Sequence, residues 1–248
     1  MSTPDRIYAV GDIHGHLAKL KAVHDNIAVD LAAHPAASHA ILHIGDYTDR
    51  GPDSRGVIEY LINGDTRRAP WINLYGNHDR MILRFLEERG GADPILRKDL
   101  YWLHPRLGGD TTLRSYGVDV PDDLDSDHGA RMFDAARKAI PQSHVAFLRG
   151  LRLSYHWRDF FFVHAGVKPG IPLADQVEDD LIWIRGPFHE SSADHGAIIV
   201  HGHTPVDAVE DHGNRIAIDT GAGYGNPITC TVFEADGGVR ILNGKRLR

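Results

Sequence analysis

Residues 6–15 have the sequence RIYAVGDIHG, in which an apolar run ends at a glycine. The run predicts a buried β-strand over residues 6–10. Asp12 and His14 follow it two positions apart, so in extended backbone their side chains point the same way. A carboxylate and an imidazole can form part of the coordination shell of manganese, iron or zinc. The alternative is that Asp12 caps the helix that follows.

The same pattern recurs along the first part of the chain. Apolar runs at residues 40–44 and 71–75 predict two more strands, and each run is followed by a glycine. Apolar residues at helical spacing come after each of the three strands, within residues 17–27, 54–63 and 81–86. Strands that alternate with helices predict an α/β layered fold.

The pattern changes twice in the rest of the chain. Residues 90–145 contain helical pieces, 130–140 above all, interrupted by glycine and proline, and we expect a small helical cap insertion there. The chain then becomes β-rich, with strands expected at 151–155 and 160–163 around a hairpin turn at 156–159, then at 197–200, 215–218 and near Thr229 and Val239. We therefore predict a single domain, residues 1–248, with two packed mixed β-sheets flanked by helices.

The composition argues against several classes of protein. A formal net charge of -7 disfavours a general nucleic-acid-binding surface. Cys230 is the only cysteine, which suits a reducing compartment, and its apolar surroundings predict a buried, inert thiol. The sequence shows neither a secretory signal nor a run of membrane-spanning length. We expect a cytoplasmic protein that binds neither nucleic acid nor membranes.

Further segments also place metal donors beside glycine at the exit of a predicted strand. They are GDYTDRG at residues 45–51, GNHD at 76–79, HAG at 164–166 and HGHT at 201–204. Any one of them could arise by chance. Together with GDIHG they describe a site for two metal ions, the usual apparatus for displacing a group from phosphorus.

Several residues of these segments are candidate ligands. Asp46 is placed between the two metals, because a carboxylate has two oxygens and can bridge two cations. Asn77 would offer its amide oxygen to the second metal. His164 follows a very apolar strand and is a better ligand candidate than a core histidine. His201 and His203 are both plausible; we favour His203, in the loop, as the ligand and His201 as a supporting or packing residue.

Other polar residues of the segments suit chemistry rather than metal binding. His78 is the best general acid, since an imidazole titrates near neutral pH, and Asp49 would orient it. Arg50 could grip two phosphate oxygens. The alternatives are an Asx turn at Asp49, a salt bridge from Arg50 to Asp49 or Asp53, and a helix cap formed by His78 and Asp79.

The segments, in this order and at this spacing, resemble those of metallophosphoesterases of the phosphoprotein phosphatase branch. The bacterial and bacteriophage-lambda-type serine/threonine phosphatases are the most similar group, and the match spans Gly11 to Thr204. The resemblance implies a calcineurin-like sandwich that binds one metal through Asp12, His14 and Asp46. It implies a second metal on Asp46, Asn77, His164 and His203.

The resemblance also implies catalytic roles. His78 and Asp49 would form the acid pair, and Arg50 would hold phosphate. Arg185, in LIWIR at residues 181–185, matches the family's Trp-x-Arg segment and would be a second phosphate clamp. Eukaryotic members carry a tyrosine near the site late in the chain; Tyr224 is a candidate to which we assign no role.

The resemblance implies a phosphatase for phosphomonoesters, on phosphoserine or phosphothreonine proteins or small phosphoesters, with direct attack by a metal-bridging hydroxide. Two divalent ions are expected, manganese first, with iron or zinc as alternatives. One alternative function is hydrolysis of diadenosine tetraphosphate, although relatives specialised for it often lack the aspartate that this chain has at Asp49. The other is a non-catalytic module for phosphorylated partners, disfavoured because every expected ligand is present.

Overall fold

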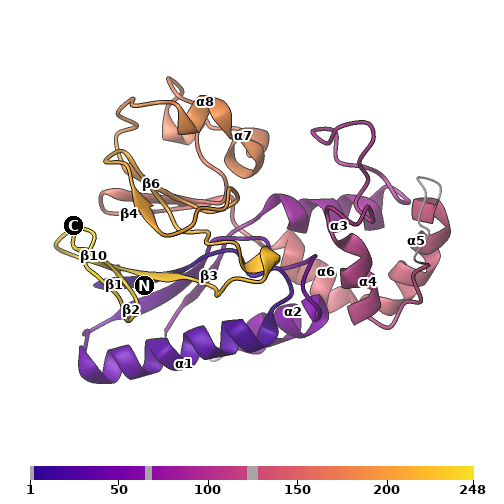
Figure 1. Cartoon of the computed structure of the whole chain (residues 1–248), viewed down its shortest axis with the longest axis horizontal. Helices are drawn as coiled ribbons and strands as arrows, with labels where there is room; N and C mark the ends of the chain where they lie inside the picture. Colours follow the sequence, from indigo (N-terminus) through magenta and orange to yellow (C-terminus); the bar gives the residue numbers. More distant parts are fainter. Residues whose placement is uncertain (1–2, 65–68, 122–127) are drawn as a thin grey trace.

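The computed structural model describes residues 3–64, 69–121 and 128–248, and in them two five-stranded sheets face each other (Figure 1). The first sheet has the order β10-β9-β1-β2-β3; its strands are β1 Arg6–Val10, β2 His39–His43, β3 Trp71–Asn73, β9 Cys230–Glu234 and β10 Val239–Ile241. The second has the order β4-β5-β6-β8-β7; its strands are β4 Ser154–Trp157, β5 Phe160–Val163, β6 Ile198–His201, β7 Glu210–Asp211 and β8 Arg215–Ala217.

Both sheets are mixed. Parallel pairing joins β1 to β2 and β2 to β3, and also β5 to β6 and β6 to β8. The remaining pairs are antiparallel. Since the carboxyl ends of parallel strands meet at one edge of a sheet, the loops that follow β1, β2 and β3 gather there, opposite the loops after β5 and β6.

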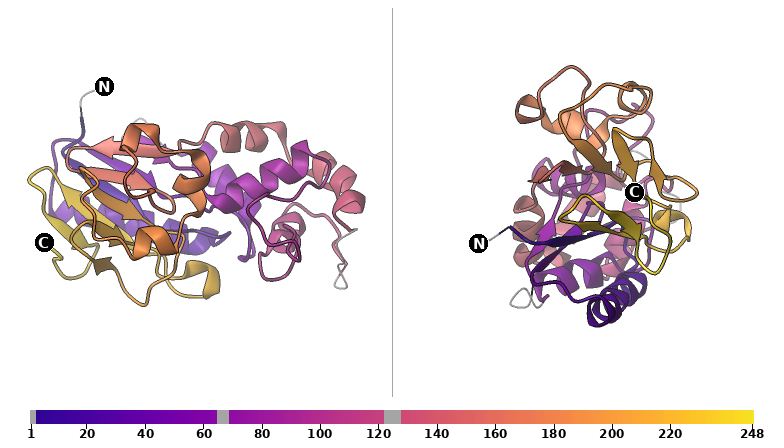
Figure 2. Two further views of the ribbon diagram at one scale, coloured as in Figure 1. Left: turned by 90° about the horizontal axis from the view of Figure 1, so that it is seen from above. Right: turned by 90° about the vertical axis from the view of Figure 1, so that its left-hand side faces the viewer.

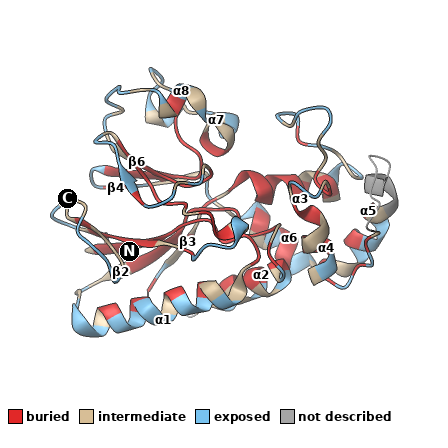
Figure 3. Cartoon of the chain, viewed as in Figure 1, coloured by how far each residue is buried: buried red, intermediate tan, exposed pale blue. Residues whose placement is uncertain are grey.

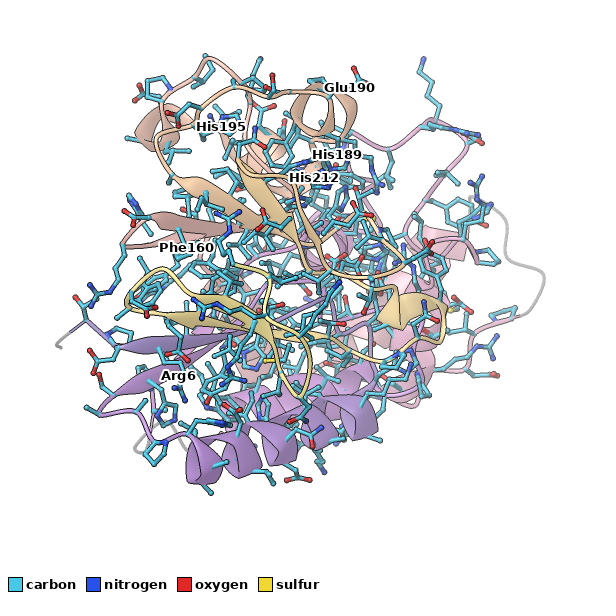
Figure 4. All side chains as sticks on the ribbon, turned by 60° about the vertical axis from the view of Figure 1, so that its left-hand side comes forward. Arg6, Phe160, His189, Glu190, His195 and His212 are labelled. Atoms are coloured by element: carbon cyan, nitrogen blue, oxygen red, sulfur yellow. The ribbon has the colours of Figure 1, made fainter. Side chains whose placement is uncertain are left out.

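Apolar side chains fill the space between the sheets. Phe160, labelled in Figure 4, is buried there, and its ring lies 4.9 Å from that of Phe233. Helices α1 Leu17–Ala33 and α2 Ser54–Ile62 cover the outer face of the first sheet. Helices α7 Glu178–Trp183 and α8 Gly186–His189 cover the second. The prediction of two packed mixed sheets flanked by helices is confirmed.

A group of helices lies beside the sandwich rather than on a sheet face (Figure 2, left). It contains α3 Asn77–Glu87, α4 Gly109–Ser115, α5 His128–Ala139 and α6 Gln142–Arg149. These helices share a core that includes Met81 of α3, Leu113 of α4 and Leu148 of α6. The predicted insertion at residues 90–145 thus packs on α3. Residues 122–127 of this insertion lie outside the described part of the chain. Its role as a cap over the site stays a prediction.

The hairpin differs from the prediction. Strand β4 runs to Trp157 and pairs with Phe160, so only Arg158 and Asp159 form the turn, and the proposed turn at 156–159 was wrong. Trp157 stays in the ladder because its ring is buried between the sheets and its Nε1 donates to the carbonyl of Pro4. Arg152, expected in the strand, instead bridges to Leu74 beyond the end of β3.

Two smaller expectations concern Cys230 and the membrane. Cys230 is buried in β9, and burial raises the pKa of its thiol, which keeps the thiol protonated and unreactive. No helix in the described ranges combines the length and the apolar character needed to span a bilayer.

Candidate functional site

The loops at the facing edges of the two sheets carry strained backbone. Positive φ angles occur at His14 (46°), Asp46 (53°), Asp49 (75°), Arg50 (66°) and His203 (64°). Such angles cost about 1–3 kcal/mol each outside glycine and gather at functional sites. The same loops and the first turn of α3 are buried (Figure 3).

Asp46 lies where the predicted ligands meet. Two groups of side chains in the described residues bring their ligand atoms within 4.8 Å of one another: His14, Asp46 and His78, and Asp46, His164 and His203. Asp46 belongs to both groups, which is the position that a bridging carboxylate would need. One oxygen lies 3.5 Å from Nε2 of His14 and the other 3.4 Å from Nε2 of His164. The first group contains His78 where the sequence predicts Asp12.

Backbone carbonyls orient two of the imidazoles. Nδ1 of His14 lies 2.9 Å from the carbonyl of Thr48, and Nδ1 of His164 lies 3.1 Å from that of Ile44. A carbonyl only accepts, so Nδ1 carries the proton and the lone pair of Nε2 points into the site. Metal-binding histidines are commonly oriented in this way.

Acceptor atoms converge at His164. Its Nε2 lies 3.0 Å from Oδ1 of Asn77 and near Asp46. The imidazole could donate from both nitrogens only as a cation, but burial lowers the pKa of His164 and favours the neutral ring. Lone pairs of a neutral nitrogen and of two oxygens that face one another fit a bound cation.

The region around His203 also fits a cation. Its Nε2 is buried and has no hydrogen-bond partner among the described residues, and its backbone N–H lies 3.2 Å from the carboxylate of Asp12. Burial and the charges of Asp219 and Asp46 raise the pKa of Asp12. Burial raises the pKa of Asp219 to about 6. An orphaned imidazole beside several buried carboxylates is an environment that divalent cations stabilise.

The choice between His201 and His203 follows from the strand. His201 ends β6 and packs on the outer face of the second sheet, 5.0 Å from the ring of Phe188, on the same side as His189, which Figure 4 labels. His203 lies two residues later and its ring is 5.1 Å from that of His164. The structure therefore brings His203, and not His201, to the other candidate ligands.

His78 and Asp49 form the predicted pair. Nδ1 of His78 lies 2.6 Å from Oδ2 of Asp49, and both side chains are buried. The carboxylate of Asp49 therefore faces His78 and does not form an Asx turn. The neighbouring Asp79 accepts hydrogen bonds from the backbone N–H groups of Gly76, Asp46 and Tyr47, so it caps α3 and also holds the Asp46 loop. Asp12 does not cap α1, and no side chain in the described part of the chain does so.

Arg50 points into the same space. Its guanidinium donates to Nε2 of His14 at 2.6 Å and to Nε2 of His78 at 3.1 Å. In the described residues it has no ion pair with Asp49 or Asp53; Asp53 instead caps α2. The exposed ring of Tyr224 lies 4.9 Å from the Arg50 guanidinium carbon. Tyr224 is thus at the site, although the sequence argument assigned it nothing.

Arg185 is exposed and lies at the edge of the site. Its Nη1 is 3.4 Å from the hydroxyl of Thr204, in the loop that carries His203. Desolvation of its guanidinium by the surrounding protein lowers the pKa of Arg185, while Tyr224, Asp46 and Asp12 act in the opposite direction. That coupling connects Arg185 electrostatically to the candidate metal ligands.

Sequence reasoning missed three residues. Asp219 follows β8 as Asp12 follows β1, and its position after an apolar strand could have indicated it. Trp102 and Thr112 lie in the segment that showed no motif, yet both donate hydrogen bonds to Asp49. No spacing rule connects them to Asp49, because the contact depends on how residues 90–115 fold.

Comparison with known proteins identifies a family and several relatives. The family described as calcineurin-like phosphoesterase matches residues 5–241. The chain is 22% identical to a bis(5'-nucleosyl)-tetraphosphatase PrpE (asymmetrical) of Oceanobacillus iheyensis, over 92% of this chain and 88% of that protein. It is 28% identical to serine/threonine-protein phosphatase 1 of Salmonella typhimurium, over 90% and 89%.

A solved structure shares the fold. A cold-active protein tyrosine phosphatase superposes with a TM-score of 0.65 at 17% identity, covering 99% of this chain and 78% of that one.

Proposed function

Because the chain belongs to the calcineurin-like phosphoesterase family, whose members use a dinuclear metal site, we propose that it is a metal-dependent phosphatase for phosphomonoesters. Its substrates would be phosphoserine or phosphothreonine proteins, or small phosphoesters. The observation that carries the proposal is the position of Asp46 between two groups of buried ligands, beside the His78–Asp49 pair.

The ligand assignment follows the chain's own side chains. Asp12, His14 and Asp46 would hold one ion, and Asp46, Asn77, His164 and His203 the other. Manganese is our first choice, and iron and zinc suit the same nitrogen and oxygen donors. Bound cations would supply an activated water at neutral pH and neutralise charge on phosphate oxygens.

The remaining polar residues would act on the substrate. His78 would give its proton to the leaving oxygen, and Asp49 would keep the imidazole aligned by the 2.6 Å contact at Nδ1. Arg50 and Arg185 would bind phosphate oxygens, since a guanidinium donates in a planar fork and stays charged. The exposed position of Arg185 leaves it free to meet an incoming phosphate.

A second candidate uses the same site on dinucleotide polyphosphates. Two observations favour it: relatives carry the name bis(5'-nucleosyl)-tetraphosphatase, and the exposed ring of Tyr224 beside Arg50 could stack on a nucleobase. A third candidate is a non-catalytic module that binds phosphorylated partners. The buried set of candidate ligands argues against this third candidate, because a module that only binds phosphorylated partners does not need a metal site.

One experiment compares rates on a phosphopeptide, p-nitrophenyl phosphate and diadenosine tetraphosphate, with Mn²⁺ added. We expect the phosphomonoesters to be cleaved faster. Preference for diadenosine tetraphosphate would favour the second candidate, and no turnover on any substrate would favour the third. Asp46→Asn is the control: it should abolish turnover and lower metal content, and full activity in that variant would contradict the bridging assignment.

We further propose that the partner is limited to such phosphorylated substrates, without nucleic acid or membrane, and that the protein works in the cytoplasm. The net charge of -7 supports the proposal that the protein does not bind nucleic acid or membranes. Retention on a nucleic-acid column or on vesicles at physiological salt would contradict it.

A further inference from the structure

The carboxylate of Asp49 is held by residues from outside the metal-binding loops. The side chain is fully buried. Nε1 of Trp102 donates to both oxygens, at 2.9 Å and 3.1 Å, and the hydroxyl of Thr112 donates to Oδ1 at 2.7 Å. Trp102 and Thr112 are themselves buried, and both belong to the helical insertion.

The hydrogen bonds from Trp102 and Thr112 hold the carboxylate of Asp49 in one orientation. The single N–H of Trp102 is shared between the two oxygens, and the Thr112 hydroxyl donates to Oδ1. The other oxygen, Oδ2, faces Nδ1 of His78 at 2.6 Å. Rotation of the carboxylate would break bonds to buried donors, which costs about 1–3 kcal/mol for each donor left unpaired. His78 therefore has a fixed partner at Nδ1, and its Nε2 points towards Arg50.

The same insertion also holds the backbone of this corner. The Asp49 N–H donates to Thr112 Oγ1 at 2.8 Å and the Arg50 N–H to the Gly108 carbonyl at 3.2 Å. Gly108 has a φ of 84°, and a Cβ there would lie 2.4 Å from the Arg50 nitrogen. Only glycine permits this approach. Residues 102–112 thus hold the backbone of Asp49 and Arg50, the two consecutive residues with positive φ angles.

We propose that Trp102 and Thr112 are positioning residues for the acid pair, and that the insertion thereby sets how well the protein cleaves esters with poor leaving groups. The inference rests on the proposed phosphatase function. It predicts a particular defect: a leaving oxygen that needs a proton suffers when His78 is misaligned, whereas nitrophenolate leaves almost without one.

The test measures kcat and KM with Mn²⁺ on phenyl phosphate and p-nitrophenyl phosphate. In Trp102→Phe and Thr112→Val we expect the ratio of kcat values, phenyl over nitrophenyl, to fall about tenfold or more, with KM changed less than about twofold. Thr112→Ser keeps the hydroxyl and should restore the ratio. His78→Asn removes the acid itself and therefore shows the largest fall in this ratio that loss of the acid can produce.

Tyr116→Phe is the matched control. Tyr116 is buried in the same helical core and its hydroxyl contacts Nδ1 of His144 at 2.8 Å, so the change removes a buried hydrogen bond without touching Asp49. It should leave the ratio unchanged. Equal losses on both esters in Trp102→Phe and Thr112→Val, or a Thr112→Ser variant as defective as Thr112→Val, would overturn the inference.

A second readout separates this inference from the proposed function. If the wild-type protein cleaves neither ester, the proposed function fails, and the contact is then judged by NMR. The indole N–H cross-peak of Trp102, assigned by its loss in Trp102→Phe, should shift in Asp49→Asn more than those of the other tryptophans. An unmoved peak would overturn the positioning role on its own.

Discussion

Gly202 lies between His201, the last residue of β6, and His203, and its lack of a side chain leaves room for the carboxylate of Asp12. A Cβ at this position would lie 2.1 Å from Oδ1 of Asp12 and 3.0 Å from Cγ2 of Ile44. Real side chains do not approach so closely, so the carboxylate would have to move. Since the His203 N–H lies 3.2 Å from that carboxylate, the displacement would also disturb the loop of the second predicted metal.

Gly202→Ala should therefore weaken Mn²⁺ binding. We expect a loss of about 10–100-fold, which is the usual effect of mutating residues that orient metal ligands. Isothermal titration of the metal-free protein measures the affinity. Gly150→Ala is the control, because the nearest atom to its added Cβ is 3.4 Å away. Unchanged affinity in Gly202→Ala would argue against Asp12 as a ligand.

Helix α3 links the site to the rest of the fold. Its first turn supplies Asn77, His78 and Asp79. The next residue, Arg80, forms a bidentate ion pair with buried Asp93, at 2.6 Å and 3.0 Å. It also reaches Glu178 and Asp179 at the start of α7. One guanidinium thus fastens α3 to the insertion and to the helix that covers the second sheet.

Arg80→Met should lower the free energy of unfolding by about 3–5 kcal/mol, because the charge of Asp93 would stay buried without a cation and would keep only the hydrogen bond from the Ile95 N–H. Urea denaturation measures the change. Arg97→Met removes an arginine whose pair with Asp99 is exposed, and it should leave stability nearly unchanged. An Arg80→Met variant as stable as Arg97→Met would show that Asp93 finds water or another donor.

The two sheets meet at the predicted ligands. Asp12 and Asp46 follow strands of the first sheet, while His164 and His203 follow strands of the second. An ion bound by ligands from both sheets cannot bind an unfolded chain equally well. Metal binding should therefore stabilise the whole fold and not a single loop.

Added Mn²⁺ should raise the melting temperature of chelator-treated protein. Free metal at 100 times its Kd corresponds to about 2.7 kcal/mol of stabilisation. Thermal unfolding with and without Mn²⁺ measures it. His164→Ala should lose most of the shift, whereas His212→Ala, an exposed histidine paired with Glu210, should keep it. A full shift in His164→Ala would contradict its role as a ligand.

The layered fold was predictable because its pattern is local. Each of the strands β1, β2 and β5 appears as an apolar run within a residue or so of its true bounds. The hairpin turn was predicted two residues too long, because burial of the Trp157 ring, a tertiary effect, keeps His156 and Trp157 in the strand. Short helices such as α7 and α8 left too little periodicity to be predicted.

The sequence alone determined which residues could bind metal, because glycine beside Asp, Asn or His after an apolar strand is a local pattern, and the order of the segments tied it to a family. The sequence also favoured Asp46 as the bridge and His203 over His201, but only the tertiary structure brings these side chains together and shows that Trp102 and Thr112 hold Asp49. These depend on distances across two sheets and an insertion, and residues far apart in sequence come within hydrogen-bonding reach only once their elements pack.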